Sequence, residues 1–174
     1  MLPEIQKLFG ILEEKRLELI KDLKVYSDAQ LHFQPSPQRW SMMMVLEHIV
    51  TAEIGMRHTH EELQHNPVRS RLQPGKFFDV VMEVLNKDLP VDVPHSSLEP
   101  ENLAELEELS KLWEEERLAF RCLIEKITAS TVDEVMFSHP VAGPLDPVRT
   151  LQLALAHFET HRRQIDRLNK DVNR

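Results

Sequence analysis

The sequence predicts an all-α protein, a four-helix bundle with a long crossover between its second and third helices. The chain of 174 residues contains only four glycines, and it is rich in Leu, Glu, Lys, Gln and Met, which favour helix. Four long segments repeat apolar residues three and four positions apart, the spacing that gives a helix one apolar face. A proline-rich segment, 66–100, separates the second of them from the third and is too long for a tight turn. We expect one domain, 1–174, because a chain of this length builds one core and seldom two.

The first helix is expected to run from about Pro3 to Tyr26. Proline suits its first turn, where a missing N–H group breaks no helical hydrogen bond. The apolar stripe of this helix consists of Ile5, Leu8, Leu12, Leu19, Ile20 and Leu23. The connection that follows, "SDAQLHFQPSPQRW", is broken by two prolines and is expected to be irregular.

The second helix is expected to begin after Ser41 and to continue to about His65. Serine is a favourable N-cap, because its side chain can accept a hydrogen bond from a free N–H group of the first turn. The pair Asn66-Pro67 should stop the helix. Within the crossover that follows, "GKFFDVVMEVLNKDL" predicts one short helix between prolines.

The third helix is expected from about Glu101 to Lys126, with a glutamate-rich face in solvent. Its apolar positions are Leu103, Leu106, Leu109, Trp113, Phe120, Leu123 and Ile127. Cys122 fits on or beside this stripe and is expected to be an inert core residue. The segment "FSHPVAGPLDP" is expected to be a loop, ending in Asp146 as N-cap and Pro147 at the first position of the fourth helix.

Composition excludes several classes of function. Asp and Glu number 29 against 21 Lys and Arg, a net charge of −8, which argues against a broad nucleic-acid-binding surface. The single cysteine excludes an intrachain disulfide and a cysteine-based zinc site. No run approaches the roughly 20 apolar residues of a membrane span, and no secretory signal is recognisable. We therefore expect a cytoplasmic protein that binds neither membrane nor nucleic acid.

Three histidines occupy positions where an apolar residue is expected. His157 and His161 lie four apart in the fourth helix, on one ridge between Leu153 and Ile165. His48 lies in the apolar stripe of the second helix. An unpaired buried polar group costs about 1–3 kcal/mol, so the core either tolerates three histidines or uses them as ligands. A divalent ion would occupy one nitrogen of each ring, and the pattern therefore predicts a metal site at these three residues.

The remaining six histidines have simpler interpretations. Surface or structural roles are expected for most of them: His32, His58, His60, His65 and His95. His139 enters the fourth helix through a loop beside Pro140, where a structural role is typical, although it could also border the pocket and shuttle a proton.

Five other residues lie near the expected site in the sequence. Glu47 and Glu53 are neither three nor four positions from His48, so both are expected at the surface. Trp40 could form one wall of the pocket at the three histidines, or it could pack as a hydrophobic staple before the second helix. Two arginines, Arg162 and Arg163, are expected to be solvated, although they could bind an acidic thiol cofactor.

Two stretches resemble the DinB/YfiT-like superfamily of bacterial four-helix bundles. One is "WSMMMVLEHIVTAE", and the other is "FSHPVAGPLDPVRTLQLALAHFETHRRQI", with its His-Pro…Gly loop and HxxxH helix. The order and separation of these motifs agree over essentially the whole chain. The resemblance implies a nickel or zinc ion bound by His48, His157 and His161, and a homodimer. It also implies a small-molecule substrate, which for some members is a low-molecular-weight thiol such as bacillithiol or mycothiol.

Two classes of function follow. The first is a metal-dependent enzyme, because three protein nitrogens leave a coordination position open to a water or a thiol. Within this class the resemblance favours a thiol S-transferase over a hydrolase. The second is a non-catalytic bundle that binds metal or takes part in a stress response. Imidazole ligands suit several divalent ions, so the residues alone do not select the metal, and they identify neither catalytic groups nor the substrate.

Overall fold

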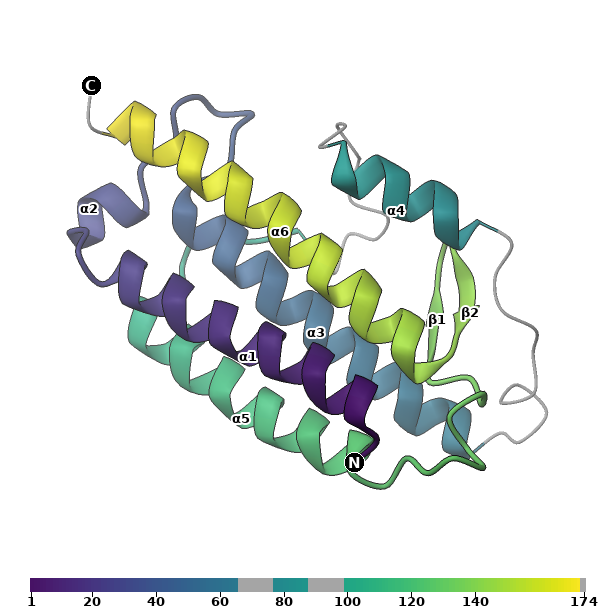
Figure 1. Ribbon diagram of the computed structural model, residues 1–174. Helices are drawn as coiled ribbons and strands as arrows, with labels where there is room; N and C mark the ends of the chain where they lie inside the picture. Colours follow the sequence, from purple (N-terminus) through teal and green to yellow (C-terminus); the bar gives the residue numbers. More distant parts are fainter. Residues whose placement is uncertain (66–76, 88–98, 173–174) are drawn as a thin grey trace.

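The structure, a computed structural model, describes residues 1–65, 77–87 and 99–172 and is mostly helical (Figure 1). Its long helices are α1 (Pro3–Leu23), α3 (Met42–Gln64), α5 (Leu106–Ile124) and α6 (Pro147–Val172). The shorter elements are α2 (Asp28–Leu31), α4 (Phe78–Asn86), β1 (Phe137–His139) and β2 (Gly143–Leu145). The predicted four-helix bundle is thereby confirmed.

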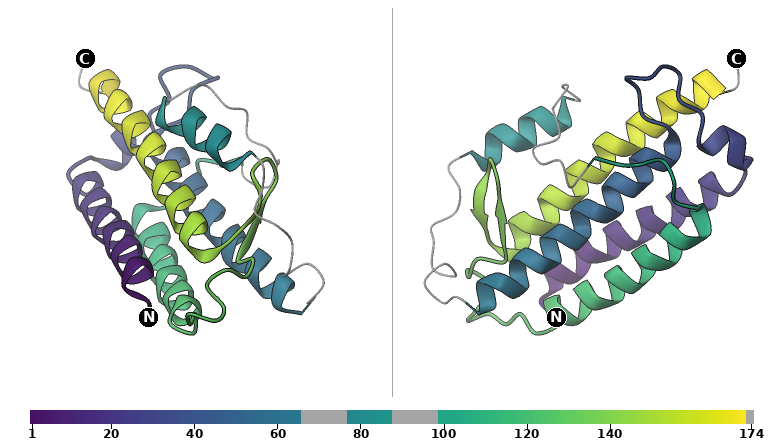
Figure 2. Two further views of the ribbon diagram at one scale, coloured as in Figure 1. Left: turned by 45° about the vertical axis from the view of Figure 1, so that its right-hand side comes forward. Right: turned by 180° about the vertical axis from the view of Figure 1, so that it is seen from behind.

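The directions of the four long helices explain the long crossover. Helix α1 packs against α5 and α6, and α3 packs against the same two helices. Figure 1 shows that α1 and α6 run in one direction while α3 and α5 run in the other. Because α3 and α5 are neighbours with the same direction, the chain must return along the whole bundle between them. Helix α4 lies within this crossover and packs on α6 (Figures 1 and 2).

The interior is built from the predicted apolar stripes. Two clusters of buried side chains fill the bundle, one around Trp113 and Leu46 and the other around Phe120 and Leu151. The stripe predicted for α1 is buried except for Leu8, which is half-buried. None of the helices in the described residues is long and apolar enough to span a membrane.

Both predicted N-cap residues are confirmed. The Ser41 Oγ accepts a hydrogen bond from the backbone N–H of Met44 at 3.1 Å, which caps α3. The Asp146 carboxylate accepts one from the backbone N–H of Arg149 at 2.8 Å, and α6 begins at Pro147. Helix α3 ends at Gln64, whereas its predicted stop signal at 66–67 lies outside the described residues.

The short elements differ from the sequence prediction. The expected loop before α6 contains an antiparallel hairpin in which Phe137 pairs with Leu145 and His139 with Gly143. Three-residue strands are too short to show an alternating pattern, so they could not be recognised. Helix α2 was also missed, although Ser27 and Gln30 form a capping box at its start.

Two predicted helix boundaries are also wrong. Helix α5 begins at Leu106 instead of Glu101, because Asn102 has a φ of 60° that a helix cannot accommodate. Helix α1 ends at Leu23 instead of Tyr26. The short helix predicted in the crossover is α4, and the remainder of that crossover lies largely outside the described residues.

Glycine-to-alanine substitutions should have opposite effects at two kinds of site. Gly10 and Gly55 lie inside α1 and α3, and a Cβ added at either would meet nothing within 4 Å. Alanine restricts the unfolded chain, so each substitution should raise the free energy of unfolding by about 0.5–1 kcal/mol. Gly143 has a φ of 77°, so Gly143→Ala should lower the same free energy by about 1 kcal/mol or more. Urea unfolding of the three variants measures these effects, and a loss of stability in Gly10→Ala and Gly55→Ala would contradict the argument.

Candidate functional site

Helices α3 and α6 bring the three singled-out histidines together. His48 projects from α3 and is buried, with 5% of its surface exposed. His157 and His161 project from successive turns of α6, and both are half-buried. Each of the three side chains offers one ring nitrogen, and these nitrogens lie within 4.8 Å of one another. The predicted convergence of these residues therefore occurs in the fold.

The distances between the rings suit a single metal ion. The Nε2 atom of His157 lies 3.2 Å from Nε2 of His48 and 3.1 Å from Nε2 of His161. Zinc–imidazole bonds are about 2.0–2.1 Å long, so two tetrahedral ligands have nitrogens about 3.3 Å apart. The observed separations are close to that value, and the three Nε2 atoms could therefore bind one ion.

A neighbouring amide fixes the orientation of His161. Its Nδ1 lies 2.9 Å from Oε1 of Gln164, one turn further along α6. Because a carboxamide oxygen only accepts hydrogen bonds, Nδ1 carries the proton and the lone pair of Nε2 faces the cluster. This arrangement is typical of metal-ligating histidines, whose second nitrogen donates to a fixed acceptor.

Electrostatics favour the neutral form of the central imidazole. Burial lowers the pKa of His157 well below its usual value, and the neighbouring His161, His48 and His139 lower it further. His157 is therefore neutral at physiological pH, and a neutral imidazole is the form that binds metal.

Trp40 forms one wall of the cluster. Its ring centroid lies 5.1 Å from that of His48 and 6.4 Å from that of His161, with the second pair stacked at 21°. Trp40 also packs against the apolar cluster around Trp113 and Leu46, so it both borders the histidines and contributes to the core. An indole in this position covers part of the surface of His48 and His161.

The fold and this cluster can now be compared with known proteins. The sequence pattern that defines the DinB superfamily matches residues 11–165. The chain belongs to the DinB superfamily. The resemblance recognised from the motifs around His48 and in 137–165 is thereby confirmed.

A solved structure of YfiT from Bacillus subtilis has the same fold as this DinB-superfamily protein. The two chains are 17% identical, the similarity covers 99% of this chain and 90% of the YfiT chain, and the TM-score is 0.65. YfiT is described as a probable metal-dependent hydrolase with an unusual four-helix bundle topology. No curated protein matches this chain in sequence.

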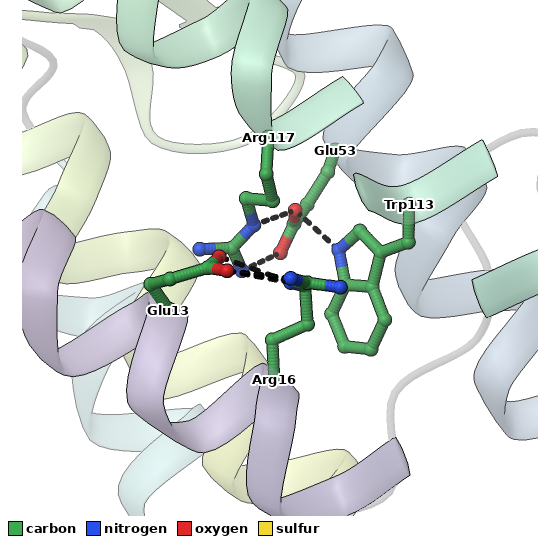
Figure 3. A network of polar contacts seen from close by, with 5 residues as sticks. All are labelled: Glu13, Arg16, Glu53, Trp113 and Arg117. Carbon is green, nitrogen blue, oxygen red and sulfur yellow. Dashed lines mark hydrogen bonds and ion pairs between the residues drawn. The ribbon is translucent and has the colours of Figure 1, made fainter. Parts of the chain in front are cut away.

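Glu53 is not the surface residue that its spacing from His48 predicted. Its carboxylate is buried against α5 and accepts hydrogen bonds from Nε1 of Trp113 and from Nε and Nη2 of Arg117, each 2.7 Å long. Figure 3 shows the Glu13–Arg16 pair of α1 pointing toward the same region. Spacing along α3 could not reveal the contacts of Glu53, because Trp113 and Arg117 lie 60 and 64 positions away in the chain.

The structure also places the other residues that the sequence analysis had singled out. Glu47 is half-buried and accepts hydrogen bonds from the backbone N–H groups of Glu101 and Asn102, which anchors the chain before α5. The prediction for Cys122 is wrong: this residue is exposed, because it lies outside the buried stripe of α5.

The two arginines of α6 are engaged with neighbouring helices. Arg162 pairs with Asp22 of α1 at 2.7 Å. Arg163 donates to the carbonyl oxygen of Leu85 at 2.7 Å, and Thr160 donates to the same oxygen at 2.9 Å. In this DinB-superfamily protein these residues therefore help to hold α1 and α4 against the helix that carries two of the histidines.

The other predicted surface histidines have mixed surroundings, and His95 lies outside the described residues. His58 and His65 are exposed, whereas burial lowers the pKa of the half-buried His60, whose Nδ1 lies 3.2 Å from the carbonyl oxygen of Met136. His32 lies near Asp28 and Glu105 in a second group of possible ligands. Both of these carboxylates are exposed, so the enclosed three-histidine cluster is the stronger candidate site.

Proposed function

We propose that this protein is a metal-dependent enzyme in which His48, His157 and His161 bind one divalent ion, nickel or zinc. The observation that carries the proposal is the convergence of three Nε2 atoms, with separations of 3.1 and 3.2 Å around His157. These nitrogens come from two antiparallel helices of a packed bundle, so they are held close to ligand geometry before any ion binds.

The surrounding residues define what such a site can do. Three nitrogen ligands leave at least one coordination position for a substrate. When bound, the ion supplies a Lewis acid that favours the deprotonated form of a thiol or a water near neutral pH. Gln164 orients His161, and Trp40 covers part of the surface of His48 and His161.

We propose that the reaction is transfer of a low-molecular-weight thiol, such as bacillithiol, to a small electrophile. In this reaction the thiol gives its proton to solvent water and its sulfur forms a bond to carbon. The bond between that carbon and the leaving group breaks, and the leaving group departs with the electron pair. The choice of a thiol rests on the resemblance of the histidine motifs to family members that use one. Hydrolysis is the second candidate, because YfiT, which shares the fold, is described as a probable metal-dependent hydrolase.

One experiment separates these candidates. Protein made without a histidine tag is loaded with Ni²⁺ or Co²⁺ and mixed with bacillithiol, then with a model electrophile. A free thiol with a pKa near 8.5 is mostly protonated at neutral pH, so thiol binding at the metal should add sulfur-to-metal charge-transfer absorption. Turnover should require both metal and thiol and should fall sharply in His48→Ala and His161→Ala.

The alternative outcomes identify the other functions. A hydrolase would cleave model esters or amides with metal alone and would show no thiol-dependent absorption. If the loaded protein does neither across several thiols and substrates, the enzyme proposal fails and a non-catalytic metal-binding bundle replaces it.

Removing the amide that orients His161 should weaken metal binding. Gln164→Leu leaves the Nδ1 atom of His161 without its acceptor, and loss of such a partner typically lowers metal affinity about 10–100-fold. Gln152→Leu, a matched change elsewhere on α6, should leave the affinity unchanged. Competition with a chromophoric chelator measures both, and equal affinities in the two variants would contradict the assigned role of Gln164.

We also propose that the protein is a homodimer. Helices α1 and α5 pack side by side and expose three leucines, Leu17, Leu112 and Leu118, of which Leu118 is 58% exposed. Sedimentation velocity at micromolar concentration should show a dimer that Leu118→Glu shifts toward monomer. Val80→Glu, a change at an exposed apolar position on α4, should leave the dimer intact. A wild-type protein that sediments only as a monomer would refute the proposal.

A further inference from the structure

The tip of the β1–β2 hairpin fixes the position of the proton on His139. The Nδ1 atom of His139 accepts hydrogen bonds from the backbone N–H groups of Val141, at 3.1 Å, and Ala142, at 3.0 Å. An imidazole nitrogen that accepts from an N–H group must present its lone pair. In the neutral ring the proton is therefore on Nε2, and the side chain offers one N–H donor in a fixed direction.

The side chain of His139 lies on the inner face of the hairpin. Along β1, Phe137 is buried, Ser138 is exposed and His139 is half-buried, so Phe137 and His139 lie on the inner face. Their rings meet edge to face, with centroids 6.0 Å apart. Phe137 belongs to the same apolar cluster as Leu153 of α6.

The hairpin that carries His139 packs on both helices of the histidine cluster. Strand β1 packs on α3, which carries His48, and β2 packs on α6. Figures 1 and 2 show the hairpin beside both helices, with its tip next to α4. His139 also contributes to the lowered pKa of His157, which places the two imidazoles within electrostatic reach of each other.

We propose that His139 is a ligand-binding residue whose Nε2–H donates a hydrogen bond to an anion held at the open position of the three-histidine site. The proposal rests on the proposed function, because it needs an ion at His48, His157 and His161. The backbone N–H groups of the hairpin tip keep the donor in place, and the sulfur of a thiolate or the oxygen of a carboxylate would accept its hydrogen bond. His139 thus favours anionic over neutral ligands.

Two substitutions separate this role from the role of His139 in the turn. In His139→Asn, the amide oxygen can replace Nδ1 as acceptor for Val141 and Ala142, but nothing replaces the Nε2–H group. In His139→Gln, the amide nitrogen can take the place of Nε2, whereas the acceptor for the turn is lost. The first variant keeps the turn without the donor, and the second keeps a donor without the turn.

Azide binding to the Co²⁺-loaded protein, followed by visible absorption, provides the measurement. A hydrogen bond to a charged acceptor is strong enough that His139→Asn should bind azide about 10–100-fold more weakly than wild type. His139→Gln should bind azide close to wild type but unfold at lower urea concentration. Co²⁺ affinity should be the same in all three proteins.

The outcomes are decisive in either direction. Wild-type azide affinity in His139→Asn would overturn the proposal, as would equal weakening in both variants, because the turn alone would then explain the effect. A protein that binds no Co²⁺ contradicts the proposed function itself, whereas normal loading with unchanged azide affinity contradicts only the role of His139. In the metal-free protein, ¹H–¹⁵N correlation spectra of the imidazoles should show the proton of His139 on Nε2, and a proton on Nδ1 would overturn the proposal without any metal.

Discussion

Replacing His157 with alanine is expected to abolish binding of the divalent ion while the bundle stays folded. His157 is the central ligand, because its Nε2 lies 3.2 Å from that of His48 and 3.1 Å from that of His161. Without it, only two protein nitrogens remain to hold the ion, fewer than the three or four protein ligands of a stable zinc site. The core around Trp113 and the core around Phe120 are formed by other residues, so helical content should remain near wild type.

Elemental analysis of protein made without a histidine tag measures this effect. Wild type should carry about one ion per chain after reconstitution with nickel or zinc, and His157→Ala should carry none. His58→Ala, which removes an exposed histidine of α3, serves as the matched control and should retain the ion. A full ion in His157→Ala would disprove the assigned ligands, and unfolding of wild type on chelation would mark a structural site instead.

The sequence predicted the histidine cluster because its decisive features are local. Two residues four apart on one helix necessarily lie on one ridge, so His157 and His161 could be paired without a structure. His48 could be added because it interrupts an apolar stripe, and in a bundle all such stripes face one interior. The same periodicity identified the four long helices, whose burial follows directly from the spacing of their apolar residues.

Features that depend on distant partners or on very few residues could not be predicted. The strands of the hairpin are three residues long, and His139 pairs with Gly143 at its tip. So short a pairing leaves no pattern that the sequence alone could show. From the sequence, Glu53 is expected to be a surface carboxylate. In the fold it lies beside Arg117, which is 64 positions further along the chain. A buried charge is tolerated only with its partner, and spacing on one helix cannot reveal a partner on another.

The buried pair of Glu53 and Arg117 should have the largest effect on stability. Their side chains are only 12% and 3% exposed, and the guanidinium binds the carboxylate through two hydrogen bonds of 2.7 Å. Removing one member of a buried pair leaves the other charge without a partner in a region of low dielectric constant. Such losses amount to about 3–5 kcal/mol, a large part of the roughly 5–15 kcal/mol that stabilises a typical domain.

Glu53→Gln tests this expectation with little change in shape. The amide keeps one oxygen but turns an NH₂ group toward donors on Arg117 or Trp113, so the free energy of unfolding from urea titrations should fall by about 3–5 kcal/mol. Glu83→Gln is the control. Both side chains of its pair with Lys87 are 61% exposed, so the free energy of unfolding should change by less than about 1 kcal/mol.

Adding Arg117→Met to Glu53→Gln should recover part of the loss, because the unpartnered charge is then removed and an apolar side chain fills its place. Equal stability of Glu53→Gln and Glu83→Gln would show that the network between α3 and α5 contributes nothing, whereas recovery in the double variant would assign the loss to the buried guanidinium.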